Sequence, residues 1–458
     1  MGGPTLLPEG QSQAYRAGAA YRARYIDPAS CSANNTCLAG VSANNSLYGV
    51  VNTNGVGFSN YNLNVRSSAL DRTIMTALSF FNGVLPPVNN ATATRFLPDG
   101  QQVIPVYSQA DSEDILIRAY SKCQAYQDRL TEWFGTEEFQ TKSQESQALR
   151  NSISALVPNM NTSLANWWNV YDAFNVWRTY SVGNPTPDVD NATFAEMQSL
   201  GYWLETAKMQ SNLTVNLLGG TILADMLQHV EDAVDAVSAN VQIYYKVVHL
   251  SGHYNTQLGT LAALELDTYP GASSLVWLKK IPSLAALMAF EVLASDEQPG
   301  QYAVRLVIQD GPAANYTAVA LPCSQEGDAA EAIAGPGSCT LDAFRDYVAQ
   351  RALNASQWCT ACQDSSTAAC QLRTAKAQLA SLNATADGSS SGIGTNSTSC
   401  SDDSGTEGWK IAVSVVLTFL GTAALTALGM WWLQRRQRGN QRFDPVTMAQ
   451  LSESAAYK

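Results

Sequence analysis

The chain has 458 residues, with 39 acidic and 27 basic side chains and a formal net charge of −12. This length is enough for one large domain, or for two smaller domains with appendages. The acidic balance, with a pI of about 4.8, argues against nucleic acid as a partner.

The first predicted element is a helix over residues 10–25, with Tyr15 and Tyr21 among its apolar positions. The loop that follows is rich in Asn, Ser and Gly and contains Cys31 and Cys37. Their close spacing favours a local disulfide, although spacing alone does not fix the pairing.

A strand-turn-helix unit comes next. Residues 61–68 are predicted to form a strand and residues 69–81 a helix, with Ile74 and Leu78 at helical spacing. Arg66 stands at the turn of this unit.

From residue 114 to about residue 230 the chain is predicted to be mostly helical. Aromatic side chains supply its bulk, and at these spacings they indicate core packing rather than a ligand site. They are Trp133, Phe134, Trp167, Trp168, Phe174 and Trp177. We expect a helical lobe, about residues 110–230, inserted into an α/β domain.

A second strand-turn-helix unit organises the middle of the chain. The apolar run 243–250 predicts a buried strand, which stops at Ser251-Gly252-His253, and residues 258–266 predict a helix. The turn lies where free backbone N–H groups and the helix dipole favour an anion. The alternative is that His253 is a hydrogen-bonded turn histidine without a ligand.

The two units together suggest a site. If both strands lie in one sheet, Arg66 and His253 emerge at the edge where open α/β sheets bind ligands. Arginine presents a planar fork of donors that suits phosphate oxygens. The alternative for both residues is a solvated surface position.

Later segments change in character. Alternating stretches such as residues 302–308 predict strands near the edge of the sheet. Residues 1–365 are expected to form the ectodomain, and residues 366–408 a stalk that is rich in Ser, Thr, Gly and Asn from residue 383 onwards.

Residues 411–433 predict a transmembrane helix. These 23 residues carry no charge, and Trp409 extends the expected membrane segment to 409–433. Four arginines follow within ten residues, whereas Asp402, Asp403 and Glu407 precede the segment. The positive-inside rule therefore places the tail 434–458 in the cytoplasm and the preceding residues outside. A buried core helix is the alternative.

Ten Asn-x-Ser/Thr sequons and nine cysteines agree with a lumenal or extracellular location. We expect glycosylation at the sequon asparagines, which are Asn34, Asn44, Asn90, Asn161, Asn191, Asn212, Asn315, Asn354, Asn383 and Asn396. Export of the ectodomain calls for a signal peptide, but residues 1–10 have neither a basic nor an apolar region of that kind. The expectation is that the sequence is incomplete at its N-terminus.

Several motifs in this order resemble the histidine acid phosphatases, the branch that contains prostatic and lysosomal acid phosphatases and phytases. The segment Arg-Ser-x-x-x-x-Asp-Arg-Thr occurs at residues 66–73 with one residue fewer between its ends, and Ser-Gly-His at 251–253 matches the family's Ser-Ala-His-Asp. Further matches are residues 7–11 with the helix after them, Ile-Pro-Val at 104–106, residues 219–223 and Leu-Pro-Cys at 321–323.

The resemblance implies a three-layer α/β fold and hydrolysis of phosphomonoesters at acid pH through a phosphohistidine intermediate, without a cofactor. It assigns Arg66 to a phosphate-binding arginine and His253 to the second histidine, which also contacts phosphate. The family's Arg-His-Gly-x-Arg-x-Pro nucleophile motif does not occur in this sequence. By the resemblance it belongs upstream of Met1.

Residue 254 departs from the family pattern. The family has an aspartate there that protonates the leaving group, and this chain has Tyr254. A tyrosine, with a reference pKa near 10, gives up its proton reluctantly at acid pH. Another carboxylic acid or water must then supply the proton, or the protein does not turn over efficiently.

The resemblance also pairs Cys323 with Cys339, and Cys123 with Cys359 or Cys362. The Cys359-x-x-Cys362 spacing is also compatible with zinc or redox chemistry, but the chain has only three histidines, and an exterior location favours disulfides. No metal-ligand cluster is expected.

The sequence thus predicts a type I membrane glycoprotein of the cell surface or the endosome–lysosome system. Its partner would be a phosphomonoester substrate, and a homodimer is a further expectation. The alternative function is an inactive pseudo-phosphatase that binds a phosphorylated ligand or protein.

Overall fold

The computed structural model describes residues 5–32, 36–41, 61–87, 100–180, 188–295 and 297–388. The chain divides into two units, Met1–Leu382 and Asn383–Lys458. The predicted membrane segment and tail, and Asn34, Asn44, Asn90 and Asn396, lie outside the described residues. Within the described ranges, no helix combines the length and the apolar character needed to cross a membrane.

A parallel sheet carries both strand-turn-helix units. Its order is β2-β1-β3, with β1 at Leu63–Ser68, β2 at Tyr107–Gln109 and β3 at Val247–Ser251. Arg66 on β1 is in register with Leu250 on β3. The expectation that the two strands share one sheet is confirmed, and their carboxyl ends lie at the same edge.

Helices cover both faces of this sheet. Val65 packs in one core cluster with Phe80 and Phe81 of α3 (Asp71–Val84). The neighbouring Arg66 reaches the opposite side, to α12 (Gly220–Ser238). Since successive side chains on a strand point to opposite faces, α3 and α12 form two outer layers around the sheet.

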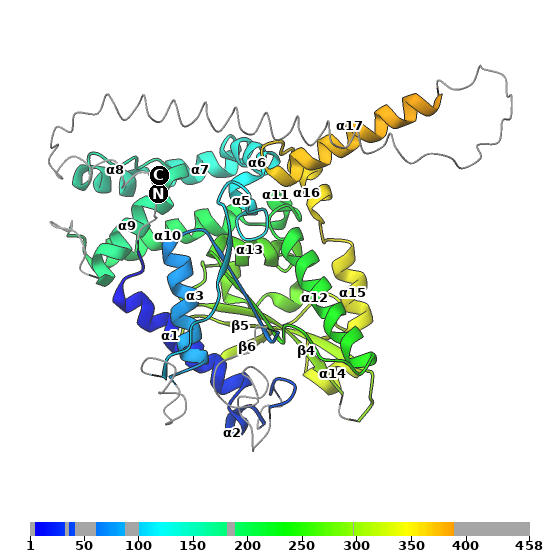
Figure 1. Ribbon diagram of the computed structural model, residues 1–458. Coiled ribbons are helices and arrows are strands. Elements are labelled where there is room, and N and C mark those ends of the chain that lie inside the picture. The colour runs from blue at the N-terminus through cyan, green and yellow to red at the C-terminus, as the bar shows by residue number, and fades with distance from the viewer. Residues whose placement is uncertain are drawn as a thin grey trace, which may run out of the picture. The chain divides into compact units, whose positions relative to one another are not determined.

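The N-terminal helix α1 (Pro8–Tyr25) runs beside α3 (Figure 1). It begins at Pro8, two residues before the predicted start, because proline suits the first helical turn. A Cβ at Gly18 would lie 1.9 Å from the Phe80 carbonyl oxygen, and one at Gly83 would lie 2.1 Å from that of Tyr15. These glycines are what let the two helix backbones approach so closely.

The later strands form a separate antiparallel sheet. Its order is β4 (Leu287–Ala294), β5 (Tyr302–Gln309) and β6 (Tyr316–Val319), and β7 (Cys339–Thr340) also pairs with β5. The expectation that residues 302–308 lie near a sheet edge is therefore wrong. β5 pairs on both sides, and most of its side chains are buried, as for an inner strand.

A buried ion-pair network joins this sheet to α1. Glu291 on β4 accepts hydrogen bonds from Arg24 and Tyr25 of α1 and from Arg305 of β5. The side chain of Glu291 is only 8% exposed, so the two guanidinium groups offset the cost of burying its charge.

The predicted helical stretch consists of α5 to α12. Their bounds are α5 Ala119–Lys122, α6 Gln124–Phe134, α7 Glu137–Glu145, α8 Gln147–Leu156, α9 Trp167–Tyr180, α10 Asn191–Lys208, α11 Ser211–Thr214 and α12 Gly220–Ser238. Trp133, Trp167 and Phe174 are buried in the main core cluster, which confirms their predicted core role. Trp168 is only partly buried and contacts Tyr254.

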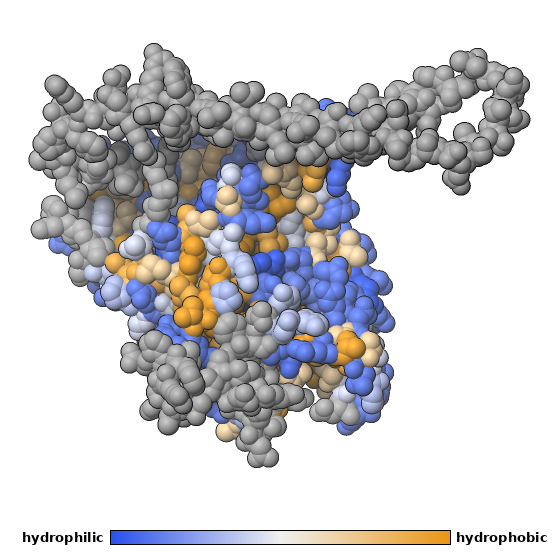
Figure 2. All heavy atoms as spheres, viewed as in Figure 1, coloured by the Kyte–Doolittle hydropathy of each residue, from blue (hydrophilic) through white to orange (hydrophobic). Residues whose placement is uncertain are grey.

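The remaining helices follow in the second half of the unit or lie near its start. They are α2 Pro28–Cys31, α13 Tyr254–Ala263, α14 Ala329–Ala334, α15 Leu341–Ala349, α16 Ala355–Ala361 and α17 Ala368–Gly388, which runs past the end of the unit. Arg345 of α15 binds Glu231 of α12 through two nitrogens. Figure 2 shows a hydrophilic surface over these two helices.

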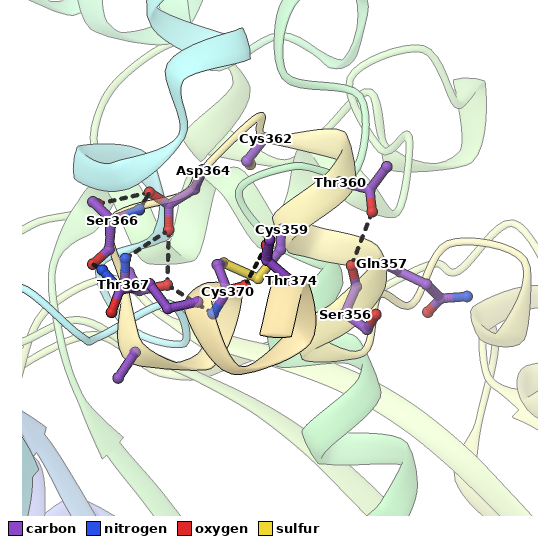
Figure 3. The surroundings of a disulfide bond; sticks show 12 residues. Ser356, Gln357, Cys359, Thr360, Cys362, Asp364, Ser366, Thr367, Cys370 and Thr374 are labelled. Carbon is purple, nitrogen blue, oxygen red and sulfur yellow. Dashed lines mark hydrogen bonds between the residues drawn. A yellow bond between two sulfur atoms is a disulfide. The ribbon is translucent and has the colours of Figure 1, made fainter. Parts of the chain in front are cut away.

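Four disulfides link the described residues. Cys31 bonds to Cys37 and Cys323 to Cys339, while Cys123 bonds to Cys362 and Cys359 to Cys370. Of the two partners left open for Cys123, the structure therefore has Cys362. Figure 3 shows the Cys359–Cys370 bond beside Asp364, whose carboxylate accepts hydrogen bonds from Ser366 and Thr367. That turn leads directly into α17.

Candidate active site

His253 lies between the end of β3 and the first turn of α13, where it is the N-cap residue. Its Nε2 is 3.0 Å from Oγ of Ser68, the last residue of β1. Oγ of Ser68 is in turn 2.9 Å from Oγ1 of Thr73 in the first turn of α3. Both hydroxyl-bearing residues are buried. This chain of contacts fixes the imidazole at the point where the two strand-turn-helix units meet.

The turn before His253 needs a residue without a side chain. A Cβ at Gly252 would lie 2.8 Å from Cγ2 of Ile117. The segment around Ile117 also packs on α13, because Oγ1 of Thr256 donates a hydrogen bond to the Ile117 carbonyl. The Ser-Gly-His sequence therefore lets the 111–120 segment close over the histidine.

The surroundings of His253 favour the neutral imidazole. Burial, together with the positive charges of Arg118 and Arg72 and against the opposing effect of Asp111, lowers the pKa of His253 to about 4. The Tyr120 ring lies edge-to-face with the imidazole at 6.0 Å. At pH values above about 4 the imidazole is therefore neutral, with one ring nitrogen as a donor and the other as an acceptor.

Arg66, the predicted phosphate-binding residue, lies on β1, as Ser68 does, but its guanidinium is paired with a carboxylate. Its two terminal nitrogens donate to the two oxygens of Asp225, at 2.8 and 2.5 Å. Asp225 Oδ2 is also 3.8 Å from Nε2 of His229. The fork of donors that the sequence suggested for a ligand is directed to α12.

Arg72 acts on His253 together with Arg118, and the sequence argument did not single it out. It is the second residue of α3, next to Thr73. Its charge lowers the pKa values of His253 and of Asp172. Among the described residues, no carboxylate forms an ion pair with Arg72, so its guanidinium is available to an anion. Arg72 is the second arginine of the Arg-Ser-x-x-x-x-Asp-Arg-Thr match, and this was the signal in the sequence that could have identified it.

Two further cations border this region. Arg118 lies 2.6 Å and Lys122 lies 3.6 Å from the carboxylate oxygens of Asp111. Asp111 thus neutralises part of the charge beside His253. An incoming anion would meet a positive surface that Asp111 only partly compensates.

Tyr254 is held away from proton transfer. Its hydroxyl donates to Oε2 of Glu205 at 2.7 Å, and Lys208 lies 2.7 Å from the other oxygen of that carboxylate. Burial and the negative charge of Glu205 raise the pKa of Tyr254 far above its usual value. The Trp168 ring covers the phenol at 5.3 Å between centroids. Tyr254 therefore keeps its proton over the whole working range of pH.

Asp172 on α9 is the other acidic group near this residue. Its side chain is exposed at the surface, yet neighbouring protein atoms desolvate it enough to raise the pKa of its carboxyl. Arg72 acts against this rise and Glu205 adds to it. A carboxyl that is both accessible and inclined to keep its proton can donate that proton to a bound ligand.

The other two histidines lie elsewhere. His249 stacks on Phe80 at 4.7 Å and meets Phe81 edge-to-face at 5.3 Å, on the α3 side of the sheet. His229 lies on α12 beside Tyr245. No group of three or more His, Cys, Asp or Glu side chains within the described ranges is arranged to hold a metal ion.

The described sequon asparagines are exposed. Those whose side chains the structure describes are Asn161, Asn191, Asn212, Asn315 and Asn354. Each is accessible enough for a glycan, and their modification remains a prediction.

Parallel strands with a histidine at their carboxyl ends, and with an arginine in the next helix that has no ion-pair partner among the described residues, define an α/β protein whose sheet edge suits an anionic ligand. The family model of the histidine phosphatase superfamily (branch 2) matches residues 1–309, and the protein belongs to this family. The resemblance seen in the sequence motifs is therefore confirmed.

Individual relatives are distant. Lysosomal acid phosphatase of Rattus norvegicus is 25% identical over 207 residues, which cover 44% of this chain and 47% of that protein. Prostatic acid phosphatase of Bos taurus is 24% identical over 256 residues, which cover 53% and 59%. The chain spans about half of the length of these relatives. The apo form of Hafnia alvei phytase has a TM-score of 0.49 and 14% identity, over 78% of this chain and 88% of that chain.

Proposed function

We propose that this protein is a phosphomonoesterase whose phosphoryl group binds between His253 and Arg72. The observation that carries the proposal is the chain of contacts from His253 through Ser68 to Thr73, the neighbour of Arg72, at the carboxyl ends of β1 and β3. A phosphohistidine intermediate is general to the family. The named relatives are acid phosphatases, which agrees with a phosphomonoester substrate.

Each residue has a distinct role in this proposal. Arg72 supplies permanent charge and paired donors for two phosphoryl oxygens. The neutral imidazole of His253 donates one hydrogen bond to a third oxygen, while Ser68 holds the ring in place. Arg66 would join them only if a ligand drew its guanidinium away from Asp225. We therefore expect Arg66 to contribute less than Arg72.

Turnover of p-nitrophenyl phosphate at acid pH tests the proposal on the purified chain. We expect His253→Ala and Arg72→Ala to lose most of the turnover. Arg129→Ala is a suitable control, because Arg129 donates to the Leu213 carbonyl in the helical lobe and does not border His253. Equal activity of all four proteins would contradict the proposed site.

The second candidate function is a binding protein for phosphorylated ligands that does not turn them over. The observation in its favour is Tyr254, which occupies the family's proton-donor position and is committed to Glu205. Tight binding of orthovanadate without turnover of any phosphomonoester would support this function. Loss of that binding in His253→Ala would place the ligand at the same site.

We further propose that the protein is a type I membrane glycoprotein of the endosome–lysosome system or the plasma membrane. The charge-free segment 411–433, its arginine-rich flank and the exposed sequons support this location. Protease added to intact vesicles or cells from the ectodomain side should spare the anchor and an epitope on residues 434–458. Digestion of that epitope would overturn the orientation.

A further inference from the structure

We propose that Asp172 of the helical lobe is the proton donor to the leaving group, in place of residue 254; this proposal rests on the phosphomonoesterase function above. The donor would then come from α9 rather than from the turn after β3. The catalytic acid and the phosphate-binding residues would lie on separate parts of the chain.

The position of Asp172 on α9 supports its role as proton donor. Trp168, four residues before Asp172 on α9, contacts the Tyr254 ring. Residues four apart lie on the same face of a helix, so Asp172 faces the region where α13 begins. The charge of Arg72 acts on both Asp172 and His253, which agrees with a place for both groups near the first turn of α13. A phosphoryl group held by Arg72 and His253 would therefore have Asp172 beside it.

A comparison of the carboxylates near His253 and Tyr254 also favours Asp172. Three carboxylates influence His253 or Tyr254, namely Asp111, Asp172 and Glu205. Asp111 is bound by Arg118 and Lys122, and Glu205 is fully buried between Tyr254 and Lys208. Within the described part of the chain, Asp172 has no hydrogen-bond or ion-pair partner and is exposed. It alone of the three is free to meet a substrate.

The electrostatic surroundings of Asp172 are also suited to a proton donor. Desolvation by neighbouring protein atoms and the charge of nearby Glu205 raise the pKa of the Asp172 carboxyl, which favours its protonated form. Arg72 opposes this while the site is empty. A bound phosphoryl dianion would compensate the charge of Arg72 and so favour the protonated acid when a substrate is present.

The oxygen of a water molecule forms a bond to phosphorus while the bond from phosphorus to the ester oxygen breaks. The ester oxygen keeps the electron pair, takes the proton of Asp172 and leaves as an alcohol. The attacking water gives one proton to the Asp172 carboxylate, which restores the acid, and its oxygen stays on phosphorus in the inorganic phosphate that is released.

Leaving-group dependence tests the role in the full chain. For Asp172→Asn we expect kcat on glycerol 2-phosphate to fall by about 10²- to 10⁴-fold, as for a lost general acid, because an alkoxide leaves poorly. Turnover of p-nitrophenyl phosphate should change by much less, since p-nitrophenolate needs no proton. Glu196→Gln is the matched control, because it removes an exposed carboxylate on α10. Its turnover of both substrates should equal that of the wild type. Equal losses on both substrates, or none, would overturn the proposal.

A binding measurement separates this proposal from the proposed function. Calorimetric titration with inorganic phosphate at several pH values needs no turnover. In the wild type, affinity should drop as Asp172 ionises and repels the anion, in addition to the titration of phosphate itself. Asp172→Asn should lack that extra drop, and Glu196→Gln should keep it. If the wild type hydrolyses nothing, the phosphomonoesterase function fails, and the same titration still decides whether Asp172 lies at the bound phosphate.

Discussion

Tyr254 donates its hydroxyl to the fully buried carboxylate of Glu205 at 2.7 Å. This contact joins the first turn of α13 to α10, and so ties the sheet to the helical lobe at the edge of the candidate site. Lys208 occupies the second oxygen of Glu205. The residue that replaces the family's proton donor is thus part of a structural contact.

Removing that hydroxyl should destabilise the fold. For Tyr254→Phe we expect the free energy of unfolding to fall by about 1–3 kcal/mol, because one acceptor site of a buried carboxylate is left unsatisfied. Urea denaturation of the ectodomain measures the change. Tyr15→Phe is the control, since Tyr15 is 44% exposed and should leave stability unchanged. A Tyr254→Phe protein as stable as the wild type would contradict the structural role.

Moving the acid back to residue 254 should require two changes. Tyr254→Asp alone would set a second carboxylate against Glu205, which like-charge repulsion disfavours. In Tyr254→Asp with Glu205→Gln this repulsion is absent. In an Asp172→Asn background, we expect this pair of changes to recover part of the lost turnover of glycerol 2-phosphate. No recovery, with phosphate affinity retained, would mean that a carboxyl at residue 254 does not reach the leaving group.

The sequence predicted the positions of both strand-turn-helix units, because each apolar run ends in a polar turn that precedes a helical pattern. It did not predict that Asp225 would bind Arg66, since α12 and β1 are 159 residues apart along the chain. It missed Arg72 for a related reason. Position at a strand end drew attention to Arg66, while Arg72, which acts on His253 together with Arg118, comes from the following helix.

The sequence predicted the core of the helical lobe but did not predict which of its residues lies near the site. Its aromatic core was predictable from composition, but Asp172 is an ordinary polar position within α9. Only the packing of Trp168 on Tyr254 brings that helix to the site. The edge position expected for residues 302–308 was wrong because alternation of apolar residues does not reveal how many strands pair with a given strand.

Acid should weaken the fold through His249. Burial lowers the pKa of His249 to about 4, below its ordinary value of 6.5. Between these values the unfolded chain binds a proton that the folded protein does not, so the free energy of unfolding decreases as the pH falls. For His249→Phe we expect a smaller loss of stability from about pH 7 to about pH 4.5, by on the order of 2 kcal/mol. An unchanged pH dependence would show that His249 is protonated in the fold.

The Cys359–Cys370 disulfide should stabilise the end of the ectodomain without acting on the site. Replacing both cysteines with serine should lower the free energy of unfolding by about 2–4 kcal/mol, because the unfolded chain gains freedom. Phosphate affinity should stay the same, since neither residue contacts His253 or Arg72. Calorimetry measures both quantities, and a large loss of affinity would contradict the separation of this disulfide from the site.

The most direct test of the phosphate site compares the two arginines in one measurement, the dissociation constant of orthovanadate at a fixed acid pH. We predict that Arg72→Ala weakens binding by about 10- to 100-fold, as expected for the loss of charge-assisted hydrogen bonds of about 1.5–3 kcal/mol. Arg66→Ala should weaken it much less, because Asp225 already holds that guanidinium. Strong loss in Arg66→Ala with normal binding in Arg72→Ala would contradict the site described above.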